Sequence, residues 1–241
     1  MNTDGLRQLW KVVFGDPDSF LDAFFQVAFS PDRCRYITEN NVPVCSLYWF
    51  DCAYEGGKLA YIYAVGTHPD HRGKGLASQL MQETHDHLKA LGYAGAVLRP
   101  ATLELFPFYE RLGYVTSGCV RRFTANASTF PAELKELSAL EYGLMRRQYL
   151  PENGVRQEGA ILDFLHTFAS FYATDDALFC VSNTEPLIFE YLGNPNSAPD
   201  ILASFDIAQY EFQTCGDEIP YTMFHPLNCT KIPGYLGISL D

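Results

Sequence analysis

The segment HPDHRGKGLA, residues 68–77, constrains this chain most, because it joins two elements of different pattern. Residues 58–67 before it alternate between two faces and predict a strand of about eight residues. Residues 75–91 after it place leucines along one helical stripe, and Gly92 is placed to end the helix. A glycine-rich turn between a strand and a helix presents unpaired N–H groups at the positive end of the helix dipole. The segment is therefore predicted to bind phosphate.

Three known phosphate-binding loops compete for this segment. A Walker loop needs Ser or Thr after its lysine, and here Gly75 follows Lys74. The dinucleotide fingerprint needs a third glycine where Ser78 stands. The third pattern, Arg/Gln-x-x-Gly-x-Gly/Ala, is matched by RGKGLA, residues 72–77, at every fixed position.

The segments around this loop and further along the chain resemble two motifs of a known family. Residues 63–81, YAVGTHPDHRGKGLASQLM, resemble the acetyl-CoA motif of the GNAT superfamily of N-acetyltransferases. Residues 105–114, LFPFYERLGY, resemble the family's second motif, and the separation of one helix plus one strand is also the family's. The resemblance covers roughly residues 30–120.

The resemblance implies acetyl-CoA as co-substrate, with the pyrophosphate on backbone N–H groups of the loop and the pantetheine arm along the preceding strand. In the family this strand usually has a bulge that splays it from its neighbour. Tyr109 matches the tyrosine that commonly protonates the leaving thiolate as a general acid. The implied cofactor-binding residues are Val65, Gly66, Thr67, Arg72, Gly73, Lys74, Gly75, Leu76 and Ala77.

The chain departs from the family pattern in two places. Thr102 stands where relatives often have an asparagine about seven residues before the tyrosine, and its hydroxyl would bind the pantetheine instead. The central strand lacks the glutamate that many relatives use as a base. Acetyltransferases of the enhanced-intracellular-survival type use their C-terminal carboxylate, so the resemblance suggests Asp241 as a catalytic residue. The alternative is an ordinary final strand over residues 235–241.

A polar stretch near residues 125–130 predicts a domain boundary. We expect residues 1–126 to form a GNAT-like α/β domain, with a mixed central sheet flanked by helices. Residues 127–241 are expected to form a second, smaller α/β domain that caps or shapes the acceptor site. Its order of elements echoes the first half, as a degenerate GNAT-like half would. Helices are predicted at 131–149 and 156–173.

Charge and cysteine usage limit the partners. The net charge is -12, and residues 126–241 carry 16 acidic and 5 basic side chains. This balance argues against nucleic-acid binding and suits a cationic acceptor, whereas the alternative is an acidic surface that is simply solvated. No apolar stretch of about 18 residues predicts a membrane span. Seven scattered cysteines without a Cys-x-x-Cys pair suit reduced thiols, so a cytoplasmic location is expected.

Several histidines and tyrosines have ordinary explanations. His68 and His71 have no evident third ligand, so loop residues are expected rather than a metal site. His85 lies two residues from His87 on a helix, which favours a solvated surface. Tyr61 and Tyr63 line either an acceptor groove or the core.

Together these features predict an N-acetyltransferase that moves an acetyl group from acetyl-CoA to a primary amine by direct attack. The acceptor is a small molecule or a peptide, and no metal takes part. The family often forms dimers, so a homodimer is a further expectation. The alternative is a catalytically inactive protein that binds acyl-CoA as a sensor or regulator.

Overall fold

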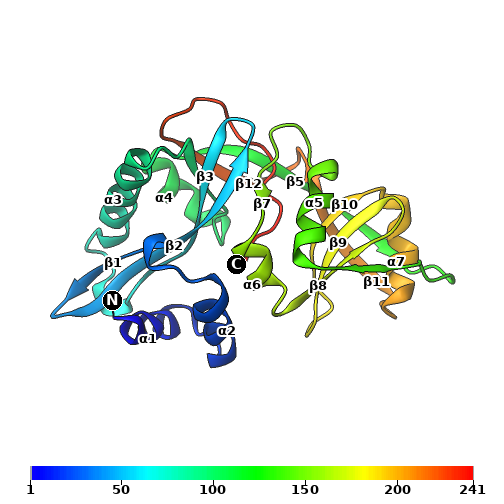
Figure 1. The fold of residues 1–241 in the computed structure, drawn as a ribbon, viewed down its shortest axis with the longest axis horizontal. Helices are drawn as coiled ribbons and strands as arrows, with labels where there is room; N and C mark the ends of the chain where they lie inside the picture. The colour runs from blue at the N-terminus through cyan, green and yellow to red at the C-terminus, as the bar shows by residue number, and fades with distance from the viewer. Residues whose placement is uncertain (1, 241) are drawn as a thin grey trace. The chain divides into compact units, whose positions relative to one another are not determined.

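In the computed structural model, which describes residues 2–240, the chain forms two compact units (Figure 1). Unit 1 comprises residues 2–115 and 223–232, and unit 2 comprises residues 116–222 and 233–240. Each unit is therefore built from two separate pieces of chain. The domain boundary after residue 126 stays a prediction. Among the described residues, no helix has the length and apolar character needed to cross a membrane.

Unit 1 is built on a mixed sheet with strand order β1, β2, β3, β4 and then the end of β12. All neighbouring pairs are antiparallel except β3 and β4, which run parallel. The first part of this sheet is made by β1 (Cys34–Glu39), β2 (Val42–Tyr54), β3 (Gly57–Thr67) and β4 (Gly95–Leu98). Residues Met223–Pro226 of β12 (Ile219–Pro226) complete it. A mixed sheet flanked by helices confirms the predicted fold class.

Helices cover both faces of this sheet, as Figure 1 shows. One face contacts α1 (Thr3–Phe14), followed by α2 (Asp18–Ala23) and a π-helical turn, η1 (Phe24–Ala28). The other face packs against α3 (Leu76–Ala90), and α4 (Phe106–Arg111) joins the same core. Strand alternation separates the two faces, because successive side chains point to opposite sides.

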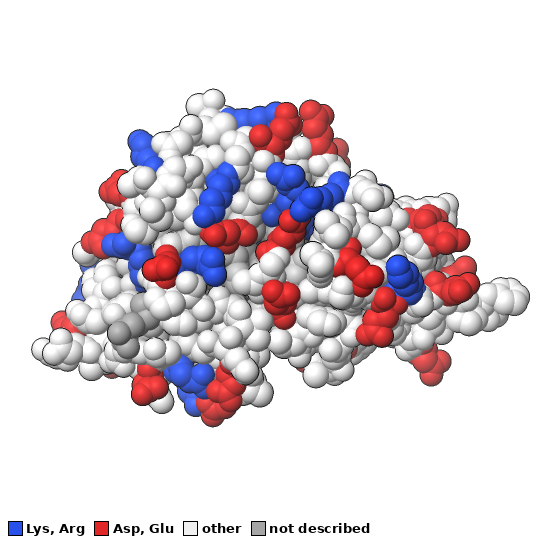
Figure 2. All heavy atoms as spheres, viewed as in Figure 1, with Lys and Arg blue, Asp and Glu red and all other residues white. Residues whose placement is uncertain are grey.

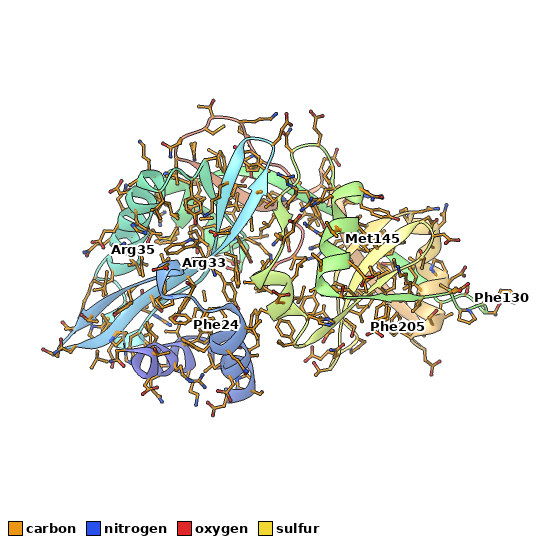
Figure 3. The ribbon with its side chains drawn as sticks, viewed as in Figure 1. Phe24, Arg33, Arg35, Phe130, Met145 and Phe205 are labelled. Carbon is orange, nitrogen blue, oxygen red and sulfur yellow. The ribbon has the colours of Figure 1, made fainter. Side chains whose placement is uncertain are left out.

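The face toward α1 is an aromatic layer. Trp10 is 2% exposed, and its ring centroid lies 5.2 Å from Tyr48 and 4.7 Å from Phe24. Phe24, labelled in Figure 3, lies on the π-helical turn that follows α2. Tyr61 and Tyr63 are also buried, so of the two explanations for these tyrosines the structure supports core packing.

Unit 2 contains a four-stranded antiparallel sheet with order β10, β9, β8, β6, and a further antiparallel pairing, β5 with β11, in which β5 also neighbours β12. The strands are β5 (Val115–Asn126), β6 (Lys135–Leu137), β7 (Arg156–Gln157), β8 (Ala169–Ala173), β9 (Ala177–Ser182), β10 (Ile188–Gly193) and β11 (Gln209–Gly216). The helices are α5 (Ala139–Tyr149), α6 (Ala160–Leu165) and α7 (Ala198–Ser204). This second sheet confirms that a smaller α/β part follows the first.

Two predicted helices of this half are wrong in extent. The helix predicted at 131–149 begins only at residue 139, after β6, because Ser138 and Glu141 form a capping box that fixes its start. The helix predicted at 156–173 ends at Leu165, and residues 169–173 form β8. In β8 the buried residues alternate and pair with two neighbouring strands. A short apolar run is compatible with either a helix or a strand, and here the pairing with neighbouring strands determines that it is a strand.

A buried ion pair lies at the centre of unit 2. Arg146 on α5 is 1% exposed, and its Nε and Nη2 donate to the two carboxylate oxygens of Glu190 at 2.7 and 2.9 Å. Tyr142 donates to the same carboxylate at 2.8 Å. Burial alone lowers the pKa of Arg146, but the attraction of Glu190 outweighs it and raises that pKa.

The ion pair also holds residues 233–240. Arg146 Nη2 donates to the carbonyl of Leu236 at 2.9 Å, and the Gln157 amide exchanges two hydrogen bonds with the backbone of Ile238. Over the described residues 235–240 the predicted final strand is wrong: the segment is buried but irregular. Side chains satisfy its backbone where a sheet ladder otherwise would.

Candidate active site

Strand β3 has a bulge near its carboxyl end. Tyr63 pairs with Tyr48 and Gly66 with Ser46, so Ala64 and Val65 both lie opposite one residue of β2. Ala64 has φ +48°, a left-handed conformation that is uncommon for a non-glycine residue. The bulge that the family resemblance implies for this strand is therefore present, and it turns the backbone of residues 64–67.

Strand β3 loses its pairing with β4 before it reaches the bulge. The parallel pairing ends at Tyr61 and Val97, whereas β3 continues to Thr67. Backbone groups on this side of β3 are thus positioned to accept an extended ligand as an added strand. Val65 packs partly on the core, and Thr67 donates its hydroxyl to Cys45 Sγ at 3.2 Å.

The loop that follows has the backbone of an anion site. Gly73 and Gly75 have φ +76° and +77°, and Gly75 is the N-cap of α3. A Cβ built on either glycine meets no atom within 4 Å, so this side of the loop is open to a ligand. The first N–H groups of α3 have no partner within the helix and lie at the positive end of the helix dipole. The residues present therefore fit a diphosphate.

Basic side chains flank this loop. Arg72 donates its Nε to the carbonyl of Thr67 at 3.2 Å, which ties the loop to the end of β3. Lys74 Nζ lies 3.5 Å from His71 Nδ1, and Glu39 Oε2 lies 3.0 Å from the same nitrogen. His68 and His71 are loop residues, as expected. Within residues 2–240 no three His, Cys, Asp or Glu side chains gather to hold a metal ion.

The other residues predicted to bind the cofactor or to act in catalysis differ in how deeply they are buried. Leu76 and Ala77 open α3 and pack on the core, and Gly66 lies against α1, where an added Cβ would come within 3.0 Å of Phe14. Tyr109 lies on α4 and is 8% exposed. Thr102 is exposed, just after β4. Asp241 lies outside the described residues, so its role stays a prediction.

Sequence reasoning missed a histidine pair in unit 1, of which His85 is buried and His225 half-buried. His85 is 2% exposed, contrary to the solvated surface expected for it, and its ring stacks on His225 with centroids 4.0 Å apart. Its Nε2 lies 2.9 Å from the hydroxyl of Tyr114. Burial, and then His225, lowers the pKa of His85 to about 3. No local pattern signals this, because His225 comes from β12.

The histidine pair predicts a loss of stability in acid. The pKa of His85 is lower in the folded chain than the ordinary value of about 6.5. Its contribution to the free energy of unfolding is therefore complete above pH 6.5 and is lost as the pH falls toward 3. Between pH 7 and pH 4 the expected loss is about 3 kcal/mol. Urea midpoints at pH 7, 5.5 and 4 measure it. The His85→Gln variant is expected to show a shallower pH dependence; an identical one would contradict this account.

The comparisons with known proteins agree with this geometry. A family model described as an acetyltransferase (GNAT) domain matches residues 2–116. A search of curated proteins found no match to the chain.

Three solved structures share the fold at low identity. A GCN5-related N-acetyltransferase from Kribbella flavida is 15% identical, with a TM-score of 0.68 over 93% of this chain and 68% of that one. A GCN5-related N-acetyltransferase from Anabaena variabilis is 18% identical, with a TM-score of 0.65 over 93% of this chain and 71% of that one. Eis1 from Mycobacterium abscessus is 10% identical, with a TM-score of 0.64 over 95% and 72%.

These alignments extend through both units, so the chain folds like these proteins over nearly its whole length. The bulged strand, the glycine loop at the start of α3 and the second motif on α4 all lie within the part that the family model matches. The chain therefore carries, over residues 2–116, an acetyltransferase domain of the GNAT superfamily.

Proposed function

We propose that this protein transfers an acetyl group from acetyl-CoA to a primary amine. The observation that carries the proposal is the open loop with two left-handed glycines at the start of α3, directly after a strand that has left its neighbour. The loop amides would hold the pyrophosphate of acetyl-CoA, with Arg72 and Lys74 adding positive charge. The edge of β3 at residues 65–67, beyond its last residue paired with β4, would hold the pantetheine arm.

The chemistry proposed is direct attack. The neutral amine nitrogen forms a bond to the thioester carbonyl carbon while the carbon–sulfur bond breaks. The amine gives up one proton to solvent water, and the departing thiolate takes one from the hydroxyl of Tyr109, which regains a proton from solvent, so the products are an amide and coenzyme A. Backbone N–H groups at the bulge would stabilise negative charge on the carbonyl oxygen.

We further propose that the acceptor is cationic. The second half of the chain supplies most of the net charge of -12. On the face shown in Figure 2, acidic and basic side chains are interspersed rather than gathered into one patch. The attraction is therefore a long-range effect of net charge, which salt screens. We expect kcat/KM for spermidine to fall more steeply with ionic strength than kcat/KM for a monoamine.

Isothermal titration with acetyl-CoA, followed by thiol-release assays with spermidine, kanamycin and a lysine-containing peptide, tests the function. Binding with turnover supports it. Binding with no turnover of any amine would favour the acyl-CoA sensor instead, and absence of binding would overturn both. Loss of activity in a variant of the loop at residues 72–77 would assign acetyl-CoA binding and turnover to this loop.

Gly75→Ala supplies that variant, and α3 offers a matched control at its other end. Gly75 and Gly92 have φ +77° and +79°, and a Cβ at either position meets no described atom within 4 Å. Alanine in this conformation costs about 1–2 kcal/mol at both positions. We expect Gly75→Ala to weaken acetyl-CoA binding at least tenfold and Gly92→Ala to leave it unchanged. Equal dissociation constants would exclude the loop as the binding site.

A further inference from the structure

A buried tyrosine connects Tyr109 to the helix that carries the cofactor loop. Tyr114 is 2% exposed, and its hydroxyl lies 2.9 Å from Nε2 of His85 on α3. Its ring packs edge-on against Tyr109, with centroids 5.7 Å apart and an interplanar angle of 70°. Its backbone N–H also donates to the carbonyl of Tyr109 at 3.1 Å. One residue therefore contacts Tyr109 twice and α3 once.

Burial keeps both groups of this hydrogen bond uncharged at neutral pH. It lowers the pKa of His85 and raises the pKa of Tyr114 well above its ordinary value. The hydrogen bond therefore joins a neutral imidazole and a protonated phenol, and either tautomer of the imidazole can make it. The ring of His225 stacks on the imidazole and packs it in place.

Tyr109 needs such a support because its own element is short. Helix α4 runs only from Phe106 to Arg111, and the chain reverses at Gly113 with φ +86°. Isolated helices of this length are not stable, so tertiary packing must hold Tyr109 in place. A shift of about 1 Å in a reacting group costs up to about 10²-fold in rate.

We infer that Tyr114 is a positioning residue for acyl transfer: its hydrogen bond to His85 holds Tyr109 at a fixed distance from α3, and hence from the cofactor loop. The inference rests on the proposed role of Tyr109 as the general acid. It adds two residues, Tyr114 and His85, that act on the reaction only through the position of Tyr109.

Tyr114→Phe tests this by removing only the hydroxyl. With acetyl-CoA and spermidine, or the amine of the panel that turns over fastest, we expect kcat to fall at least tenfold. The dissociation constant of acetyl-CoA should change by less than twofold. The matched control is Tyr54→Phe, because Tyr54 is equally buried in unit 1 and its hydroxyl donates to the carbonyl of Lys231 at 2.7 Å. Both variants are expected to lower Tm, but only Tyr114→Phe to lower kcat.

A second pair of variants addresses the His85 side of this hydrogen bond. His85→Leu removes the partner of the Tyr114 hydroxyl and is expected to reproduce the loss of kcat, whereas His85→Gln keeps an amide that can donate or accept and is expected to recover part of it. This pair also replaces Tyr114→Phe should that variant fail to fold.

The outcomes separate this inference from the proposed function. If Tyr109→Phe loses activity while Tyr114→Phe keeps kcat, the positioning role is wrong and the acid role stands. If Tyr114→Phe weakens acetyl-CoA binding as much as it lowers kcat, it moves the loop rather than Tyr109, which also overturns the inference. If Tyr109→Phe itself keeps full kcat, the acid role and the positioning role fall together, although acetyl-CoA binding and turnover stay intact.

Discussion

Replacing Tyr109 by phenylalanine is expected to lower kcat by about 10²- to 10⁴-fold, the usual contribution of a positioned general acid. The ring and its packing on Tyr114 remain, so the fold and acetyl-CoA binding should change little. Without the hydroxyl, the thiolate must leave unprotonated. Steady-state kinetics at saturating acetyl-CoA measure the effect, and Tyr54→Phe is again the control.

The pH profile gives this prediction a second readout. A general acid loses activity when it deprotonates, so kcat of the unmodified protein should fall on the alkaline side. In Tyr109→Phe that fall should disappear from the residual activity. Full retention of kcat, or an unchanged alkaline fall in the variant, would assign the proton to another group.

Arg146→Ala is expected to destabilise unit 2 by about 3–5 kcal/mol, because it leaves the carboxylate of Glu190 buried and unpaired. It also removes the donor to the carbonyl of Leu236. The neighbouring residue supplies the control: Arg147 pairs with Glu158 at 2.6 Å, but both side chains are more than a third exposed. Arg147→Ala is expected to cost only about 0.2–1 kcal/mol.

Urea unfolding followed by far-UV circular dichroism compares the two variants. The double variant Arg146→Met, Glu190→Leu removes both charges, and replacing a buried pair by apolar side chains is often neutral or stabilising. The double variant should therefore recover most of the free energy of unfolding that Arg146→Ala loses. Equal midpoints for Arg146→Ala and Arg147→Ala would show that water reaches the buried carboxylate.

The features that could be predicted from the sequence are those that depend on residues close together in the chain. Gly73 and Gly75 can adopt left-handed conformations without strain, so the loop at the start of α3 could be predicted from its own residues. The mixed sheet flanked by helices was likewise predicted from the sequence. The residue roles themselves remain predictions.

What could not be predicted depends on partners far along the chain. His85 is buried because His225 stacks on it, and more than a hundred residues separate them. Residues 169–173 form a strand rather than a helix because β6 and β9 lie on either side. Segment 235–240 lacks a ladder because Arg146 and Gln157 bind its backbone. Periodicity carries no information about such distant partners.

The division of each unit into two pieces of chain affects how the protein is made. Leu98 on β4 pairs with Met223, so one edge of that strand lacks its partner until a ribosome has added the whole intervening chain. At about 5–20 residues per second this takes several seconds. During that time an apolar strand edge is open to pairing with other nascent chains. We therefore expect synthesis to depend on chaperones that cover this edge, and slower translation to increase aggregation.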